Sequence, residues 1–318
     1  MSPDNLLLFF SGNEVINARN NTNAAPYIKA VTRDMKRYIG AHAPRHIPVG
    51  YSAADVAENI EPQALYFACG EDDNARADFF AFNDYSWCDP NDFAGAGWDV
   101  KVDTYSDYPL PIFLSEFGCI TNRRDWNEIA ALYSDNMTSV YSGGLAYEFT
   151  TEPNGYGLVE DGSNGVEPNG DFDRLRSAFE ATPAPTGDGG ARTDTSIPEC
   201  PPEDEEWAVT TRNLPEMPVG AQQYMSDGAG TGPGLADKTG SQWAGTPSET
   251  SEDLSDGVTS SEPTSNNNGG SSTSGGSSGS GNSSSGSSDA AAESAATGLQ
   301  ATVGSVMVAV IAAIALLY

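Results

Sequence analysis

Five short apolar runs, separated by amphipathic stretches, constrain the fold of this chain more than any other feature. Each run has the length of a buried strand, and the runs cover residues 6–10, 47–51, 78–82, 110–115 and 144–149. Strands that alternate regularly with helices favour a parallel sheet built from β/α units. The sequence therefore predicts an α/β fold of the (β/α)8 TIM barrel type. A complete barrel needs about three more β/α units, and we expect their place to be upstream of residue 1.

Helices are predicted between these runs, where apolar residues recur at helical spacing. Residues 24–40 form the clearest of them, with Gly40 as the expected C-cap. The other predicted helices cover residues 53–68, 125–141 and 171–180. The rest of the segment from 160 to 225 is predicted to be rich in loops.

Polar residues come directly after the apolar runs. They are Asn13 and Glu14, Tyr51, the segment 83–85, Glu116, and Tyr147 with Glu148. The carboxyl ends of the strands form the active-site face of a β/α barrel. This repeated placement predicts that these side chains share one site.

Composition changes sharply near residue 226 and divides the chain into three parts. Residues 1–225 contain enough aromatic and β-branched side chains to form a core. Residues 226–298 are mostly Gly, Ser, Thr and Asn, and are predicted to be a disordered linker that buries too little apolar surface to fold. Residues 299–318 are uncharged, mostly apolar and about as long as a membrane span.

The small residues and polar spacer before residue 299 favour a glycosylphosphatidylinositol (GPI) attachment signal over a tail-anchored helix. Ser288 or Asp289 is the expected attachment residue. Such an anchor requires an entry signal for secretion, yet residues 1–5 carry no basic residue and residues 6–10 are too short for an apolar signal core. We therefore interpret the chain as beginning within a domain, as a truncated gene model would.

The formal charge is −30, from 45 acidic and 15 basic residues. This charge repels nucleic acid and argues against it as a partner. It is compatible with an uncharged polysaccharide ligand, although solubility alone is an equal explanation. With four cysteines, no CxxC pair and only two histidines, a zinc site is not expected, and no metal or cofactor is predicted. An even cysteine count predicts two disulfides, of which spacing leaves three connectivities open.

Two acidic residues are the candidates for catalysis. Glycoside cleavage needs one carboxyl group that protonates the leaving oxygen and a second that attacks or stabilises the anomeric carbon. Glu14 and Glu116 each come directly after an apolar run. The alternatives are a first-turn helix residue for Glu14 and a buried acid bonded to loop amides for Glu116. A Ser-His-Asp triad is disfavoured, because His42 and His46 lie at no strand end and no GxSxG motif is present.

Six ordered segments resemble the fungal β-1,3-glucanosyltransferases of glycoside hydrolase family 72. They are SGNEVIN (11–17), APYIKAVTRDMKRYI (25–39), RHIPVGYSAAD (45–55), DFFAFNDYSWC (78–88), PIFLSEFGC (111–119) and SGGLAYEF (142–149). The resemblance extends over about residues 5–235, including YMSDGAGTGPGL (224–235). The family commonly has Tyr where Phe117 stands, a change that leaves the neighbouring carboxyl group intact. Its Cys-rich carbohydrate-binding module is not matched, because no cysteine follows Cys200.

The resemblance implies a retaining enzyme with β-1,3-glucan as both donor and acceptor. Glu14 would be the general acid/base, Glu116 the nucleophile, and Asn13 a ligand of the sugar 2-hydroxyl. Tyr85 would orient Glu116, and Tyr51 and Tyr147 would line the donor cleft. Core packing or sugar stacking is the alternative for the tyrosines.

The resemblance also implies the disulfides Cys69–Cys200 and Cys88–Cys119. It places the enzyme at the cell surface and in the cell wall, held to the outer leaflet of the plasma membrane by a GPI anchor. Asn20, Asn136 and Asn282 lie in sequons and are candidates for glycosylation. The alternative functions are a catalytically inactive surface glycoprotein and a plain endo-β-1,3-glucanase.

Overall fold

The computed structural model describes residues 5–163, 165–193, 195–210 and 213–230. The predicted linker beyond residue 230 and the apolar segment 299–318 lie outside the described residues, as do Asn282 and Ser288. No helix in the described ranges is long and apolar enough to cross a bilayer.

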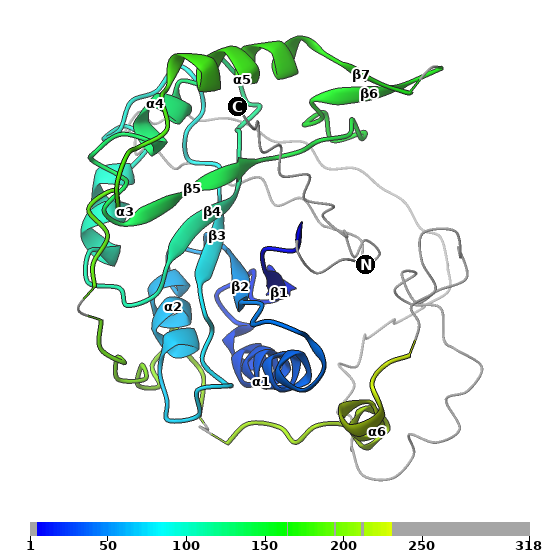
Figure 1. The fold of residues 1–318 in the computed structure, drawn as a ribbon. Helices are drawn as coiled ribbons and strands as arrows, with labels where there is room; N and C mark the ends of the chain where they lie inside the picture. The colour runs from blue at the N-terminus through cyan, green and yellow to red at the C-terminus, as the bar shows by residue number, and fades with distance from the viewer. Residues whose placement is uncertain (1–4, 164, 194, 211–212, 231–318) are drawn as a thin grey trace, which may run out of the picture. The chain divides into compact units, whose positions relative to one another are not determined.

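A five-stranded parallel sheet forms the centre of the described chain (Figure 1). Its strands are β1 (Phe9–Asn13), β2 (Val49–Ala54), β3 (Phe80–Asp84), β4 (Ile112–Phe117) and β5 (Tyr141–Ala146). Their order in the sheet is their order in the sequence. Sequential parallel strands with helical crossovers form the wall of a β/α barrel, so the predicted fold class is confirmed.

The first four strands begin and end two or three residues later than predicted, and β5 begins and ends three residues earlier. The prediction followed the apolar runs, but backbone pairing continues into the polar residues. Asn83 is paired with Glu116 across β3 and β4, for example. Asn13, Asn83 and Glu116 are therefore strand residues, not the loop residues that follow the strands, and this correction fixes their positions in the sheet.

Helices follow the outer side of the sheet in Figure 1. They are α1 (Ala25–His42), α2 (Ile60–Ala68), α3 (Trp98–Tyr105) and α4 (Glu128–Leu132), with a single 3-10 turn, η2 (Thr22–Ala24), before α1. The chain then forms the hairpin β6 (Val159–Gly162) and β7 (Gly165–Pro168), followed by α5 (Gly170–Ala181) and α6 (Val219–Asp227).

Three predicted helices differ from those observed. Gly40 lies inside α1 and does not end it, because the helix continues to His42. The helix expected over 53–68 is confined to Ile60–Ala68, because β2 continues to Ala54. The helix expected over 125–141 stops at Leu132, where a Ser-Asp-Asn segment of low helix propensity follows.

The core lies between the sheet and these helices and is largely aromatic. Phe80 and Phe82 of β3 are fully buried, and Phe67 of α2 packs against Phe80. Trp207, from the segment that returns after α5, is also fully buried and lies 5.4 Å from Tyr66, measured between ring centroids. Burial of one such ring contributes about 1.5–3 kcal/mol, so these rings are a main source of stability.

Two disulfides join distant parts of this unit. Cys69, at the end of α2, is bonded to Cys200 in the return segment, and Cys88 after β3 is bonded to Cys119 after β4. This is the pairing that the resemblance implied. The second bridge links the two loops that follow the strands carrying Asn83 and Glu116.

Candidate active site

Glu14 lies immediately after β1, where the strand register shifts between Phe10 and Asn13. Its backbone is in the left-handed region, with φ at 50°. A non-glycine residue adopts this conformation at a cost, and such residues cluster at functional sites. The backbone N–H of Glu14 donates to the carbonyl of Ser52 at 2.9 Å, which fixes the residue against β2.

Glu116 lies near the end of β4. In the sheet, β2 and β3 lie between β4 and β1, the strand that Glu14 follows. Its Oε2 accepts a hydrogen bond from the Tyr85 hydroxyl at 2.7 Å. The side chain is partly buried. The structure thus places a phenol directly on the predicted nucleophile, the contact expected from the resemblance.

Asn83 lies between the two glutamates. Its Nδ2 donates to Glu14 Oε1 at 2.8 Å. The residue is paired with Glu116 across β3 and β4, and its side chain favours the ionised form of the Glu116 carboxyl group. Asn83 is only 3% exposed, so its amide is held in place by the surrounding structure. Strand pairing and this bond bring the two carboxyl groups together at the carboxyl ends of the strands, close enough for the charge of Glu14 to act on Glu116.

The surroundings of Glu116 act on its pKa in both directions. Burial raises the pKa above its usual value, and the negative charges of Glu14 and Glu148 add to this rise. The hydrogen bonds from Tyr85 and Asn83 oppose it, because they stabilise the carboxylate. The net direction is upward.

A hydrogen-bonded layer of small polar side chains supports this pair from below. Ser52 Oγ donates to Asn13 Oδ1 at 2.6 Å and lies 2.7 Å from Ser115 Oγ. Ser115 Oγ in turn donates to Asn83 Oδ1 at 2.8 Å. The sequence analysis missed both serines, and no local pattern indicates them, because they meet only through strand pairing.

Three tyrosines surround the Glu116 side of the site. The rings of Tyr85, Tyr147 and Tyr156 pack edge to face. The distance between ring centroids is 6.4 Å for Tyr85 and Tyr147, 5.5 Å for Tyr85 and Tyr156, and 5.4 Å for Tyr147 and Tyr156. Arg124 holds two of them, donating to the carbonyls of Tyr147 at 2.9 Å and Tyr156 at 2.7 Å. Tyr156 was missed, because it lies in a loop outside the predicted strand ends.

Tyr51 does not line a cleft in this structure, contrary to the expectation. It is fully buried in the core, where it packs against Phe67 and its hydroxyl accepts from the backbone N–H of Ile16. Burial raises its pKa to about 12. The expectation was wrong because Tyr51 lies within β2 and does not follow it. Side chains alternate between the two faces of a strand, and that of Tyr51 points into the core. The tyrosine therefore supports the segment after Glu14 from behind.

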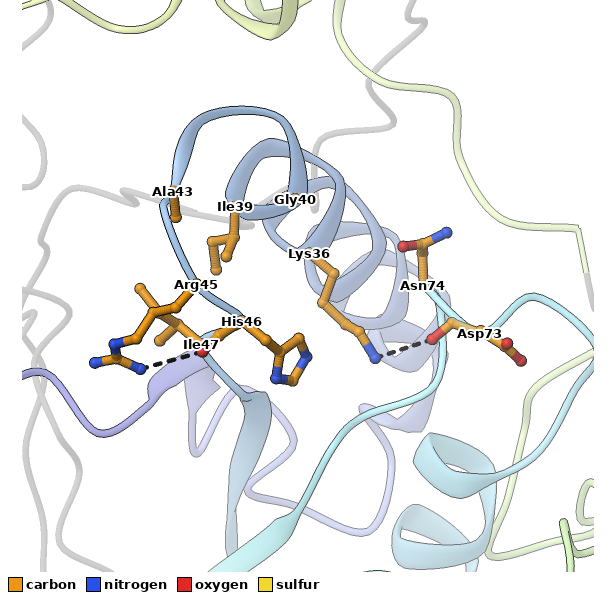
Figure 2. Close-up of a pocket in the computed structure, with 9 residues that line it drawn as sticks. All are labelled: Lys36, Ile39, Gly40, Ala43, Arg45, His46, Ile47, Asp73 and Asn74. Carbon is orange, nitrogen blue, oxygen red and sulfur yellow. Dashed lines mark hydrogen bonds between the residues drawn. The ribbon is translucent and has the colours of Figure 1, made fainter. Parts of the chain in front are cut away.

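A cavity of about 500 Å³ lies at the amino-terminal ends of the strands, away from the glutamates. It is lined by residues before β2 and β3 and by the end of α1, including Lys36, His46 and Asp73 (Figure 2). Lys36 already donates to the carbonyl of Asp73, as Figure 2 shows, and to Asp78. Within the described ranges, no group of three or more His, Cys, Asp or Glu side chains is placed to hold a metal ion. The sequon residues Asn20 and Asn136 are both exposed.

Comparison with known proteins found a matching family model and several relatives. The family model described as Glucanosyltransferase matches residues 2–183. The chain is 53% identical over 233 residues to the 1,3-beta-glucanosyltransferase gel1 of Aspergillus fumigatus, covering 73% of this chain and 51% of the relative. It is 46% identical over 237 residues to the 1,3-beta-glucanosyltransferase GAS5 of Saccharomyces cerevisiae, covering 73% of this chain and 49% of that relative.

Solved structures show the same likeness. A mutant of Saccharomyces cerevisiae Gas2p, solved in complex with laminaritetraose and laminaripentaose, matches with a TM-score of 0.61 and 38% sequence identity. The match covers 68% of this chain and 48% of that protein, so the chain spans about half the length of the relatives it matches. The chain belongs to the glucanosyltransferase family, glycoside hydrolase family 72.

Proposed function

We propose that this protein is a 1,3-beta-glucanosyltransferase that cleaves an internal β-1,3-glucan linkage and transfers the new end to another glucan. One observation carries the proposal: the Glu14 and Glu116 carboxyl groups lie on either side of Asn83 at the carboxyl ends of the strands, with Asn83 bonded to Glu14 and paired with Glu116. A retaining glycosidase needs two carboxyl groups about 5–5.5 Å apart. The effect of the Glu14 charge on the pKa of Glu116 supports such proximity.

In the first step, a Glu116 carboxylate oxygen attacks the anomeric carbon of the donor while Glu14 protonates the departing glycosidic oxygen. The bond between that carbon and oxygen breaks, the shortened glucan leaves with the proton, and a glycosyl ester forms on Glu116. The hydrogen bond from Tyr85 holds the carboxylate in one orientation for the attack. Asn83 keeps Glu14 facing the same sugar.

In the second step, Glu14 is the base. It takes the proton of an incoming 3-hydroxyl, and the acceptor oxygen attacks the anomeric carbon and releases Glu116. The product has one new β-1,3 bond, and both carboxyl groups return to their starting protonation states. Transfer exceeds hydrolysis only where an acceptor sugar occupies the site in place of water.

Asn13 supports the proposed contact with the sugar. Its Oδ1 accepts from Ser52 and Asn83, and the residue is exposed, so its Nδ2 can donate to a bound sugar. A hydrogen bond from this amide to the 2-hydroxyl strengthens as the oxocarbenium ion forms. Tyr147 and Tyr156 offer rings against which sugars stack.

The names of the relatives support β-1,3-glucan as the substrate class, as does the Gas2p complex with laminari-oligosaccharides. By extension, we propose residues 1–225 as the catalytic part, 226–298 as a spacer and 299–318 as a GPI-attachment signal that places the enzyme at the cell surface. The latter two rest on sequence composition.

Incubation of the full-length natural protein with reduced laminari-oligosaccharides tests the proposal. Products longer than the donor are expected, whereas only shorter products would indicate an endo-β-1,3-glucanase, and no products a surface glycoprotein without activity. Glu14→Gln and Glu116→Gln should each abolish turnover with the melting temperature unchanged within a few degrees. Substantial turnover in either folded variant would refute its role.

A further inference from the structure

Asp84, the last residue of β3, is a buried carboxylate whose oxygens are all engaged. Oδ1 accepts from the backbone N–H of Ser86 at 2.8 Å and from its hydroxyl at 2.5 Å. Oδ2 accepts from Trp98 Nε1 at 3.1 Å and from Lys101 Nζ at 2.6 Å. The Asp84 side chain is 0% exposed. The backbone at 84–86 is therefore closed into a turn around this one carboxylate.

Tyr85 lies inside that turn. Its two neighbours in the chain, Asp84 and Ser86, are joined by the hydrogen bond to the Asp84 carboxylate. Its own hydroxyl donates to Glu116 Oε2 at 2.7 Å. The Asp84 carboxylate also attaches this turn to α3, through its contacts with Trp98 and Lys101. Lys101 also bonds Asp55 at 2.7 Å, which follows β2, so its ammonium connects two neighbouring strand ends.

A buried ion pair is weak evidence for stability, because desolvation offsets most of the Coulomb attraction. Its geometric effect is clearer, since the Asp84 carboxylate that pairs with Lys101 also holds the Ser86 backbone, and Tyr85 lies between Asp84 and Ser86. We propose that the Asp84–Lys101 ion pair is a positioning device that holds the Tyr85 hydroxyl against the Glu116 carboxylate. This inference rests on the proposed role of Glu116 as nucleophile.

The consequence reaches Glu116 through one hydrogen bond. The Tyr85 contact lowers the pKa of Glu116 against burial and against the charges of Glu14 and Glu148. The Tyr147 and Tyr156 hydroxyls are the other titratable groups near this carboxylate. Burial raises the pKa of both, so they remain neutral near neutral pH. Loss of the Tyr85 bond should therefore move the Glu116 pKa upward.

Asp84→Asn tests the idea with little change of volume. One end of the asparagine becomes an NH2 group, which then faces either Trp98 and Lys101 or the Ser86 donors. Both orientations place donor against donor, so the turn should loosen, while Lys101 keeps Asp55 as its partner. The variant should therefore fold. Tyr85→Phe is the reference, because it removes the hydroxyl itself.

The first measurement is the pH dependence of kcat/KM in the full-length natural protein, whose acid limb reports the ionisation of the nucleophile. Tyr85→Phe should shift that limb upward by about one pH unit, the scale of a hydrogen bond to a charged group. Asp84→Asn should shift it in the same direction by about half as much. Its kcat should fall about tenfold, with KM within about twofold, because substrate contacts remain.

A matched control lies at the other end of the same strand. Lys36 and Asp78 form a second partly buried pair at 2.7 Å, just before β3 and beside the cavity of Figure 2. Asp78→Asn should lower the melting temperature without moving the acid limb. A shift in Asp78→Asn equal to that in Asp84→Asn would overturn the inference, because general destabilisation would then explain both.

The second measurement is an NMR titration of the Glu116 carboxyl group, which needs no turnover. A raised Glu116 pKa in Asp84→Asn and Tyr85→Phe supports the inference even if the natural protein proves inactive, in which case only the proposed function fails. An unchanged Glu116 pKa in folded Asp84→Asn would overturn the inference, and the ion pair would then be structural only.

Discussion

Asn83→Leu is the substitution that most directly perturbs the link between the two carboxyl groups. Leucine has the branched shape of asparagine and a larger volume, so the 3%-exposed position remains filled. The change removes the 2.8 Å bond to Glu14 Oε1 and the acceptor for Ser115 Oγ. It also removes the amide that favours the ionised form of Glu116.

The size of the effect follows from these bonds. A hydrogen bond to a charged group contributes about 1.5–3 kcal/mol. If the transition state loses one such bond, kcat/KM falls about 10- to 150-fold, since 1.36 kcal/mol is a factor of ten. The acid limb of the pH profile should also move upward, because the Asn83 bond lowers the Glu116 pKa. The free energy of unfolding should fall by about 1–3 kcal/mol, because Ser115 loses its acceptor.

The assay combines initial rates on reduced laminari-oligosaccharides with a denaturant melt of the same preparation. Ser115→Ala is the control, since it removes the bond to Asn83 Oδ1 but keeps the amide that contacts the glutamates. It should lower kcat/KM less than about fivefold, with a stability loss of about 1 kcal/mol. If folded Asn83→Leu keeps kcat/KM within threefold of the natural protein, the Asn83 amide is not what organises the two glutamates.

Two further predictions concern stability. Removing the Cys69–Cys200 bridge, whose residues are 131 apart, should lower the free energy of unfolding by about 5 kcal/mol, against about 4 kcal/mol for Cys88–Cys119 at a separation of 31. Denaturant melts of the Cys→Ser variants measure both losses, and a larger loss for Cys88–Cys119 would contradict the prediction. The value of kcat should fall more on loss of Cys88–Cys119, because this bridge joins the loops beside the site. Burial raises the pKa of Glu128 to about 7. The protonated carboxyl group is therefore favoured in the folded state, and the folded protein loses stability as the pH rises towards 7. Glu128→Gln should therefore stabilise the protein by about 2 kcal/mol at pH 8 and little at pH 4, and equal effects at both pH values would refute this.

The sequence predicts the parallel sheet and the pair of glutamates proposed for catalysis, because both follow from local patterns. Apolar runs separate the strands, and Glu14 and Glu116 come directly after two of them. The Asn-Glu and Ser-Glu-Phe-Gly motifs then carry the resemblance to the family. These features need no knowledge of tertiary contacts.

The remaining features depend on register and packing. Asn83 bonds Glu14 and is paired with Glu116 only because the register of β3 and β4 shifts between Phe82 and Asn83, which no single strand encodes. Tyr51 is a core residue because β2 continues past it, whereas an apolar run that ends in tyrosine indicates a strand end. Tyr156 reaches the site from a loop that tertiary contacts with Arg124 hold in place.

The account depends most on covalent attachment of the donor sugar to Glu116. The natural protein treated with a 2-deoxy-2-fluoro laminari-oligosaccharyl fluoride should accumulate a glycosyl-enzyme, because the fluorine slows its breakdown. Peptide mass spectrometry should then place the added sugar on Glu116, with no adduct in Glu116→Gln. A label on another residue, or turnover with inversion at the anomeric carbon and no adduct, would contradict the account.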